Sequence, residues 1–208
     1  MIDPGQLNWG KMNGMIPAIV QDAASGEVRM LGYMDRAALD ATITEGFVTF
    51  YSRSRAGPWR KGETSGNVLD LVEVRVDCDG DALLILASPR GPTCHTGSDS
   101  CFGQQGAPGT GFLASLAATL QLRASADPLT SYTAQLALGG VKRIAQKVAE
   151  EGVEVALAAV SGDQGELTNE AADLLYHLTV LLPAAGSSWT DVISELKRRQ
   201  ASSATASS

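Results

Sequence analysis

The sequence has no long hydrophobic run and no long basic block. No stretch of its 208 residues approaches the roughly 18 consecutive apolar residues that a membrane-spanning helix needs. Residues 1–5 also lack the basic and apolar regions of a secretory signal peptide. The formal net charge is −7, whereas nonspecific binding to a nucleic-acid duplex depends on clustered lysine and arginine. We therefore predict a cytoplasmic protein that binds neither membranes nor nucleic acid.

Cysteine is scarce, and its number is odd. Cys78, Cys94 and Cys101 are the three cysteines of the chain. A disulfide framework is not expected in a chain without an export signal, so metal binding or redox chemistry is the more useful interpretation of these thiols. Hydrophobic residues make up 44% of the sequence and charged residues 19%. This balance is typical of a globular protein with a packed core.

The N-terminal half consists mainly of short runs that favour β-strands. These runs cover 16–20, 27–31, 48–51, 69–76 and 82–87. One helix is predicted over 35–44, because Asp35 is a suitable N-cap and Gly46 a suitable stop. We therefore predict a mixed α+β domain with short strands.

Beyond Phe102 the composition changes. A glycine-rich stretch follows, and alanine, leucine and glutamate then replace the β-branched residues. Helical windows cover 112–124, 133–161, 168–182 and 189–199, with Pro183 and Gly186 between the last two, which predicts an all-α arrangement of four helices. We predict an N-terminal domain over 1–103, a linker over 104–111 and a helical domain over 112–200. Residues 201–208 have little apolar bulk and are predicted to be a mobile tail.

Three aspartates and a cysteine alternate just before the last predicted strand of the N-terminal half. In a β conformation the aspartates would lie on one side of the strand and the cysteine on the other. Hard carboxylate oxygens suit magnesium or calcium, and a soft thiolate suits zinc. An EF-hand is excluded, because its loop needs glycine and glutamate where this sequence has alanine and serine. A solvated acidic turn is the alternative interpretation. The residues are Asp77, Cys78, Asp79 and Asp81.

The other two cysteines lie in a polar, glycine-rich segment, 91–102, which is unlike the surroundings of a buried structural thiol. Three thiolate ligands and a fourth position open to water are the pattern of a catalytic zinc. His95 is either the fourth ligand or a nearby acid–base group. A nucleophilic cysteine paired with His95 is less favoured, because adjacent residues of an extended segment point apart.

Cations, hydroxyls and glycines gather between residues 52 and 67. Glycines admit close approach, hydroxyls and amides donate hydrogen bonds, and arginine or lysine supplies charge, so these residues could form a phosphate cradle. A basic surface loop is the alternative. The candidate substrate-binding residues are Arg53, Arg55, Trp59, Lys61, Gly62, Glu63, Thr64, Ser65, Gly66 and Asn67.

Carboxylates also mark two of the predicted helices. The carboxylates of the first helix are spaced so that they share one face of it, and their like charges repel each other. A divalent cation would remove this repulsion. Those on the second lie among apolar residues, where idle charges are uncommon. If the helices pack, the carboxylates converge on a magnesium site, and an exposed stripe is the alternative. The residues are Lys147, Glu150, Glu151 and Glu154 on the first helix, and Glu170 and Asp173 on the second. His177, one turn further, is interpreted as a core or interface residue.

Several ordered motifs carry a resemblance to known families. The N-terminal half resembles phosphoribosyl-AMP cyclohydrolases through Ser-Arg-Ser-Arg at 52–55, Trp-x-Lys-Gly-Glu-Thr-Ser-Gly-Asn at 59–67, Asp-Cys-Asp-x-Asp at 77–81 and Cys-His-Thr-Gly-x-x-Ser-Cys-Phe at 94–102. The C-terminal half is similar to phosphoribosyl-ATP pyrophosphohydrolases, all-α relatives of the MazG-type nucleotide pyrophosphatases. It carries Lys-Val-x-Glu-Glu-x-x-Glu at 147–154 and Glu-x-x-Asp-Leu-Leu-Tyr-His at 170–177. Their fusion in this order resembles the bifunctional enzymes of histidine biosynthesis.

The resemblance implies two metals and two hydrolytic reactions. It implies zinc on the three cysteines, drawn from both subunits of an intertwined homodimer, and magnesium on Asp77, Asp79 and Asp81. It also implies magnesium in the helical domain on Glu150, Glu151, Glu154, Glu170 and Asp173. There one of the first three glutamates activates the water that releases pyrophosphate from phosphoribosyl-ATP, with Lys147 in substrate binding. Zinc hydroxide then opens the adenine ring of phosphoribosyl-AMP between N1 and C6, with His95 moving protons.

Two rival functions remain open from the sequence. In the first, only the helical domain hydrolyses nucleoside triphosphates, and the N-terminal half is a non-catalytic zinc-binding module. In the second, the zinc module has no enzymatic role, because His95 completes a closed four-ligand site. Loss of ring opening on Cys94→Ala separates the first rival from the bifunctional enzyme.

Overall fold

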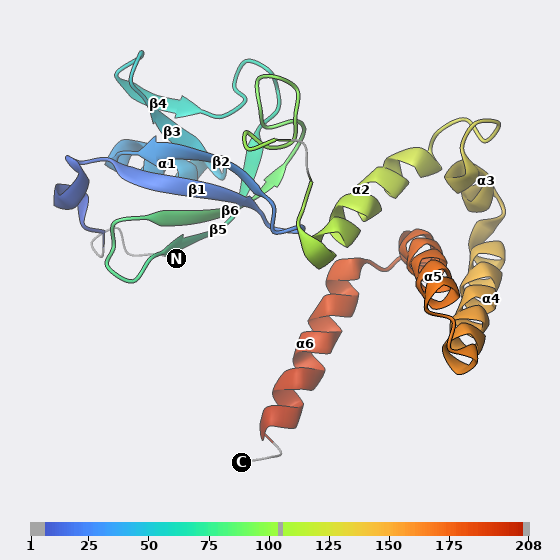
Figure 1. Cartoon of the computed structure of the whole chain (residues 1–208). Helices are drawn as coiled ribbons and strands as arrows, with labels where there is room; N and C mark the ends of the chain where they lie inside the picture. The colour runs from blue at the N-terminus through green and yellow to red at the C-terminus, as the bar shows by residue number, and fades with distance from the viewer. Residues whose placement is uncertain (1–6, 104–105, 206–208) are drawn as a thin grey trace. The chain divides into compact units, whose positions relative to one another are not determined.

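In the computed structural model, which describes residues 7–103 and 106–205, the N-terminal half forms one four-stranded sheet and a separate hairpin (Figure 1). The strand order of the sheet is β2-β1-β6-β5, with β1 parallel to β6 and the other pairs antiparallel. The sheet strands are β1 (Ile16–Asp22), β2 (Val28–Met34), β5 (Leu69–Val76) and β6 (Leu83–Pro89), and the hairpin strands are β3 (Thr49–Ser52) and β4 (Gly57–Arg60). The predicted α+β class of this half is confirmed.

The core of this unit lies on one face of the sheet. Ile16, Ala18 and Val20 alternate along β1 and are fully buried, as the period of two requires. The helix α1 (Arg36–Glu45) packs against β3 and β4. It begins where Asp35 accepts a hydrogen bond from the Ala38 amide, and it ends at Gly46, whose φ is +75°. The predicted helix is confirmed.

The sequence did not predict strand β4. The surrounding segment 52–67 was interpreted as a possible phosphate cradle or a basic surface loop, and Gly57 and Pro58 have low strand propensity. The strand forms because it pairs with β3, where Phe50 opposes Trp59. Phe50 also packs directly on β2, since a Cβ at Gly32 would lie 2.3 Å from the Phe50 ring.

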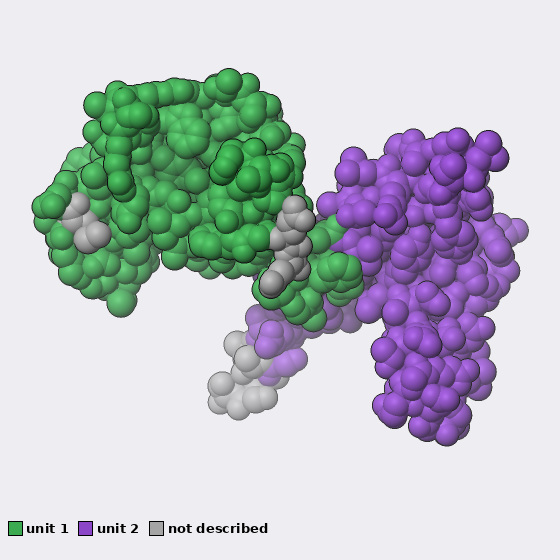
Figure 2. Space-filling view, turned by 45° about the horizontal axis from the view of Figure 1, so that its top comes forward, with its two compact units in different colours: residues 1–115 green, residues 116–208 purple. Residues whose placement is uncertain are grey.

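The C-terminal half is entirely helical, as predicted. The chain divides into two compact units, residues 1–115 and residues 116–208 (Figure 2). After the short 3₁₀ turn η3 (Gly109–Gly111) the helices are α2 (Phe112–Ala124), α3 (Tyr132–Leu138), α4 (Gly140–Ser161), α5 (Gln164–Ala184) and α6 (Trp189–Thr205). Among the described helices, none combines the length and the apolar character needed to cross a bilayer.

Helices α4 and α5 lie side by side and form the main contact of this unit (Figure 1). The chain reverses at Gly162, whose φ is +78°, and Asp163 caps α5 by accepting the amides of Gly165 and Glu166. A small core of Leu120, Leu136, Ile144 and Val180 accompanies this hairpin. The two helices therefore bring the predicted carboxylates of both to one region.

Several helix boundaries differ from the prediction. Helix α5 begins at Gln164 rather than at residue 168, because Asp163 caps it. The window 133–161 is two helices, because Gly139 ends α3 and Gly140 has a φ of +69°. Pro183 does not separate α5 from α6 but lies in the last turn of α5, where only one hydrogen bond is lost. Helix α6 continues to Thr205, so residues 201–205 of the predicted tail are helical, and 206–208 lie outside the described residues.

Candidate active sites

Two loops of the N-terminal unit enclose a pocket of about 410 Å³. One loop contains most of the predicted phosphate cradle, and the other contains a cysteine and the histidine beside it. The pocket is lined by Trp59, Lys61, Gly62, Glu63, Thr64, Ser65, Asn67, Pro92, Cys94, His95 and Gly97. Pro92 and Gly97 were not singled out from the sequence, because only the folded chain brings the second loop to the first.

Two glycines allow these loops to close on each other. Gly62 has a φ of +81°, and a Cβ there would lie 2.2 Å from the carbonyl oxygen of Asn67. A Cβ at Gly91 would lie 2.5 Å from the side-chain oxygen of the same asparagine. A larger residue at Gly62 would force a backbone shift, and one at Gly91 would displace the Asn67 side chain. Asn67 is therefore the point at which the two loops meet.

Cys94 is activated by its own turn. The Cys94 amide donates to the carbonyl oxygen of Ser98 at 2.9 Å, and the Thr96 hydroxyl donates to the Cys94 sulfur at 3.1 Å. The hydrogen bond from Thr96 is the largest of the causes that lower the pKa of Cys94 to about 6. The thiolate, the form that binds metals, therefore prevails at neutral pH.

The Cys94 and His95 side chains do not point apart, so that prediction is wrong. The segment is a turn rather than an extended strand, and the Cys94 sulfur lies 3.8 Å from His95 Nδ1. Both side chains line the same pocket. His95 is thus placed beside the thiolate, where it can exchange protons with a ligand bound in the pocket.

Cys101 is held on strand β2. Its amide donates to the carbonyl oxygen of Arg29 at 2.8 Å, and the Ser100 hydroxyl donates to that of Val28 at 2.7 Å. The Arg29 side chain is nearly buried and pairs with Asp22 at 2.7 Å. Partial burial, followed by the charge of nearby Cys94, raises the pKa of Cys101. The two cysteines of this loop therefore lie near each other.

Cys78 precedes strand β6 in the chain and lies at the end of that strand opposite to the Cys94 loop. It belongs to the exposed turn before β6, whereas Cys94 follows the strand. Seven strand residues at about 3.3 Å each separate the turn from the loop by roughly 20 Å. Within one chain, the described residues do not bring the three cysteines together.

The three aspartates lie on a turn and not on a strand, so the predicted alternation of faces is wrong here. Strand β5 ends at Val76, and Asp77 then accepts the amides of Asp81 and Ala82 at 3.0 and 3.1 Å. This turn brings one oxygen of each of Asp77, Asp79 and Asp81 within 4.8 Å of the others. Three hard oxygen donors on an exposed turn fit a hydrated magnesium ion.

A lysine ammonium already lies at this turn. Lys11 Nζ is 2.5 Å from a carboxylate oxygen of Asp79 and 2.5 Å from one of Asp81. The short 3₁₀ helix η2 (Trp9–Met12) carries it there, and the Asn8 amide anchors this helix by donating to Gly80. These carboxylates raise the pKa of Lys11, and Lys11 lowers that of Asp79. The ammonium therefore occupies the position that a cation would take.

We expect Lys11→Met to bind magnesium more tightly at this turn, by about fivefold, because a divalent ion no longer displaces an ammonium. The metal-free variant should also melt at a lower temperature, since its carboxylates lack a counter-charge. Calorimetric titration with magnesium measures the affinity, in a Glu170→Gln background that removes the magnesium site expected in the helical domain. Lys11→Arg keeps the charge and is the matched control. Equal affinities of Lys11→Met and Lys11→Arg would contradict the competition.

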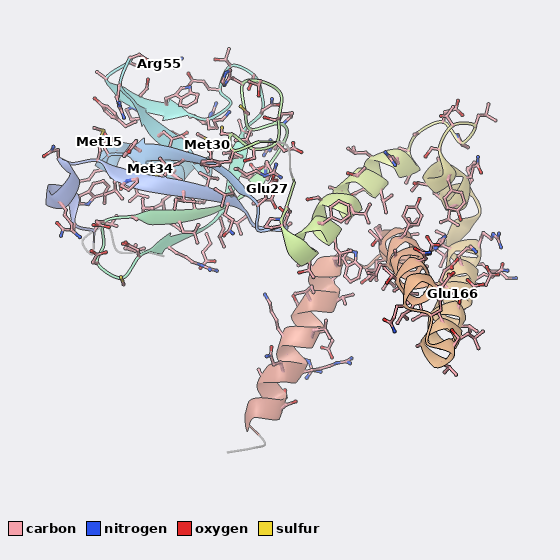
Figure 3. All side chains as sticks on the ribbon, in the orientation of Figure 1. Met15, Glu27, Met30, Met34, Arg55 and Glu166 are labelled. Carbon is pink, nitrogen blue, oxygen red and sulfur yellow. The ribbon has the colours of Figure 1, made fainter. Side chains whose placement is uncertain are left out.

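Arg53 and Arg55 lie away from the pocket lining. Both are in the turn that joins β3 to β4, and Figure 3 labels Arg55 at the tip of this hairpin. Arg55 forms an ion pair with Glu63, and the Arg53 guanidinium lies 5.6 Å from the centre of the Tyr33 ring. Gly66 is also outside the lining. Of the predicted cations of this region, Lys61 alone lines the pocket.

In the C-terminal unit, Glu151 and Glu154 of α4 meet Glu170 of α5. One oxygen of each carboxylate lies within 4.8 Å of the others. Glu151 is only 5% exposed. Partial burial, followed by the charges of Glu154 and Glu151, raises the pKa of Glu170. Three converging carboxylates, one of them buried, are a donor set that fits magnesium.

The remaining predicted residues border this cluster. Lys147 donates to Glu150 at 3.0 Å and pairs with Glu151 at 2.9 Å. The other oxygen of Glu150 accepts from Gln146 at 2.7 Å, so both of its oxygens already have partners outside the cluster. Asp173 is not in the cluster either, but it lines the adjoining pocket together with Glu151.

This second pocket has a volume of about 450 Å³. Its lining combines carboxylates, a lysine and aromatic rings: Tyr132, Lys147, Glu151, Asp173, Tyr176 and His177. His177 is 4% exposed, as expected for a core residue. The tyrosines were not predicted, because α3 must cross α5 before Tyr132 meets Tyr176, and no local pattern indicates that crossing.

Comparisons with known proteins agree with both halves. The family model of phosphoribosyl-AMP cyclohydrolase matches residues 30–103, and that of phosphoribosyl-ATP pyrophosphohydrolase matches residues 113–200. The chain is 57% identical over 194 residues to the histidine biosynthesis bifunctional protein HisIE of Escherichia coli K12, covering 93% of this chain and 95% of that protein. It is 52% identical over 198 residues to the HisIE of Photobacterium profundum, covering 93% and 96%.

Proposed function

The chain belongs to the HisIE family of bifunctional histidine biosynthesis proteins, and we propose that its two pockets are the two active sites of this hydrolase. As a member, it is both a phosphoribosyl-ATP pyrophosphohydrolase and a phosphoribosyl-AMP cyclohydrolase. The C-terminal unit releases pyrophosphate, and the N-terminal unit opens the adenine ring of the product. The two domains are proposed to span 112–200 and 1–103, with 104–111 as the linker.

The observation that carries the N-terminal assignment is the activated thiol in the pocket. Cys94, whose pKa is lowered to about 6, faces the same space as His95 and Lys61. We propose that Cys78, Cys94 and Cys101 hold zinc, with a fourth position open to water. A zinc ion held there would lower the pKa of bound water and supply hydroxide near neutral pH.

The other residues of this pocket bind and orient the substrate. Lys61 offers a cation for a phosphate group, and Thr64 and Ser65 offer hydroxyl donors. The Trp59 ring gives an apolar surface for the base. His95, 3.8 Å from the Cys94 sulfur, moves the proton between the attacking water and the ring nitrogen that leaves. Arg53 and Arg55 extend the phosphate-binding surface at the hairpin.

We propose a homodimer in which each zinc takes ligands from both subunits. The distance of roughly 20 Å between the Cys78 turn and the Cys94 loop supports it, because one chain alone does not bring these thiols together. The outer face of the sheet also carries exposed apolar residues, among them Ile19 at 37% and Leu31 at 45% exposure. Val153, Leu157 and Val160 lie similarly exposed along α4. Such surfaces suit association with a second copy.

In the C-terminal unit, we propose that Glu151, Glu154 and Glu170 hold magnesium, with Asp173 and Glu150 nearby. Magnesium held there would neutralise charge on the departing pyrophosphate. Lys147, between Glu150 and Glu151, offers a cation for the phosphates. The base is one of Glu150, Glu151 and Glu154, and the hydrogen bonds that occupy both Glu150 oxygens favour the other two.

The test is an assay of the purified protein on phosphoribosyl-ATP that follows pyrophosphate and the ring-opened product together. The bifunctional enzyme yields both, and zinc chelation should stop only the second. If pyrophosphate forms without ring opening in zinc-loaded protein, the alternative stands: a nucleoside triphosphate pyrophosphatase with a non-catalytic zinc module. Because the substrates are small biosynthetic intermediates, we place the protein in the cytoplasm.

A further inference from the structure

Three aromatic rings form one wall of the C-terminal pocket. Tyr132 of α3 stacks beside Tyr176 of α5, with ring centres 6.2 Å apart and planes inclined by 28°. The His177 ring meets the Tyr176 ring edge-on at 5.3 Å. Glu151, which belongs to the carboxylate cluster, lines the same pocket. An aromatic surface thus adjoins the proposed magnesium site.

Hydrogen bonds hold this wall in place. His177 Nδ1 lies 2.8 Å from the carbonyl oxygen of Asp173, which only accepts, so Nδ1 carries the proton. The Tyr132 hydroxyl lies 3.1 Å from the other ring nitrogen, Nε2. The Thr133 and Tyr176 hydroxyls are 2.7 Å apart. Both tyrosines are therefore oriented before any ligand arrives.

Core packing does not account for Tyr132. Its side chain is 53% exposed, although its hydroxyl is tied to the buried His177. A half-exposed ring contributes little to the hydrophobic core, but a fixed ring at the edge of a pocket suits a flat ligand. The pocket volume of about 450 Å³ is within the range of small-molecule sites.

We propose that Tyr132 and Tyr176 form the subsite for the purine base of the substrate in the pyrophosphohydrolase reaction. The base lies against the tyrosine wall, while Lys147 and the carboxylate cluster, which adjoin this wall in the same pocket, take the phosphates. The adenine of phosphoribosyl-ATP carries a substituent at N1 and is electron-poor, and electron-rich phenol faces attract such rings. This inference rests on the proposed function of the C-terminal unit.

The test compares Tyr132→Leu with Tyr132→Phe, with pyrophosphate release as the readout. Leucine keeps apolar bulk but removes the ring, so KM for phosphoribosyl-ATP should rise about tenfold, in line with the strength of base–aromatic stacking, with kcat within about threefold. Phenylalanine keeps the ring and loses only the hydroxyl, so it should restore KM to within about threefold of wild type. A fall in kcat at unchanged KM, or no change in Tyr132→Leu, would overturn the subsite.

A second measurement uses the wild-type protein and does not depend on the folding of a variant. AMP and ribose 5-phosphate are compared as competitive inhibitors of pyrophosphate release. A base subsite predicts that AMP inhibits at a concentration at least about tenfold lower, and equal inhibition overturns it. Should wild type release no pyrophosphate from phosphoribosyl-ATP at all, the proposed function fails, which is a separate outcome from equal inhibition.

Discussion

Mixing the Cys78→Ala and Cys94→Ala variants is expected to restore about one quarter of the ring-opening activity that each variant lacks. Alone, each should lose about a thousandfold or more of this activity, because the proposed zinc would contribute several kcal/mol to activating the water. We expect this restoration because Cys78 and the Cys94 loop lie at opposite ends of strand β6. In the proposed dimer, the partner subunit supplies the missing thiol.

The fraction follows from twofold symmetry. Each zinc site would take Cys78 from one subunit and Cys94 with Cys101 from the other. In a mixed dimer one site carries both substitutions and the other carries neither. Random exchange of subunits makes about half of the dimers mixed, so about a quarter of all sites are complete. Co-refolding of the two variants, followed by an assay of ring opening on phosphoribosyl-AMP, measures this directly.

A third variant is the matched control. Cys94 and Cys101 lie in one loop, so the same subunit supplies both, and mixing Cys94→Ala with Cys101→Ala should restore nothing. Pyrophosphate release should stay at the wild-type rate in all three variants, because the helical unit is unchanged. Restoration in both mixtures, or in neither, would contradict the shared site.

Local signals in the sequence predicted most of the elements. Helix α1 needed only its cap at Asp35 and its stop at Gly46, and both are made by contacts within one turn. Helix α2 has the predicted bounds of Phe112–Ala124. Strand β4 was missed because its residues form a strand only by pairing with β3. This strand was missed because a partner from elsewhere in the chain decides its conformation, whereas the missed break at Gly139 and Gly140 has a local cause.

For the candidate sites, the sequence predicted which residues take part but not how they are arranged. Residue types and spacing indicated the carboxylates and thiols, because metal chemistry depends on ligand type. The geometry was wrong for residues 77–81, where Asp77 folds the chain into a turn by accepting two amides. Spacing also gave no sign that Cys78 and Cys94 lie at opposite ends of β6. The tyrosine wall depends on the crossing of α3 and α5, which has no local signature.

Glu170→Gln is expected to lower pyrophosphate release by about a hundredfold or more while raising the melting temperature of the metal-free C-terminal unit at pH 7. The activity falls because a neutral amide is a poor magnesium ligand. Stability rises because partial burial and the charges of Glu154 and Glu151, which raise the pKa of Glu170, disfavour its charged form in the folded state. Calorimetric melting in chelator, beside the pyrophosphate assay, measures both effects.

The pH dependence gives the sign of the stability effect. The pKa of Glu170 in the folded state lies above its ordinary value, so protonation of Glu170 stabilises the fold. This stabilisation is fully present below the ordinary pKa of a glutamate, and it is lost as the pH rises through the raised pKa. The advantage of Glu170→Gln should therefore be largest near pH 7 and vanish as pH falls below the ordinary range of a glutamate. Added magnesium should stabilise wild type more than the variant, because it binds the folded cluster.

Glu166 on the same helix is the matched control for this pair of effects. It lies in the first turn of α5 (Figure 3), where the helix dipole favours negative charge. Glu166→Gln should keep full pyrophosphate release and lower stability slightly. Activity should fall while metal-free stability rises only when the substituted carboxylate is a metal ligand that repels its neighbours in the absence of the metal. If Glu170→Gln lowered both the rate of pyrophosphate release and the metal-free melting temperature, Glu170 would be a structural residue. The close approach of the Glu151, Glu154 and Glu170 carboxylates would then need an explanation other than a bound cation.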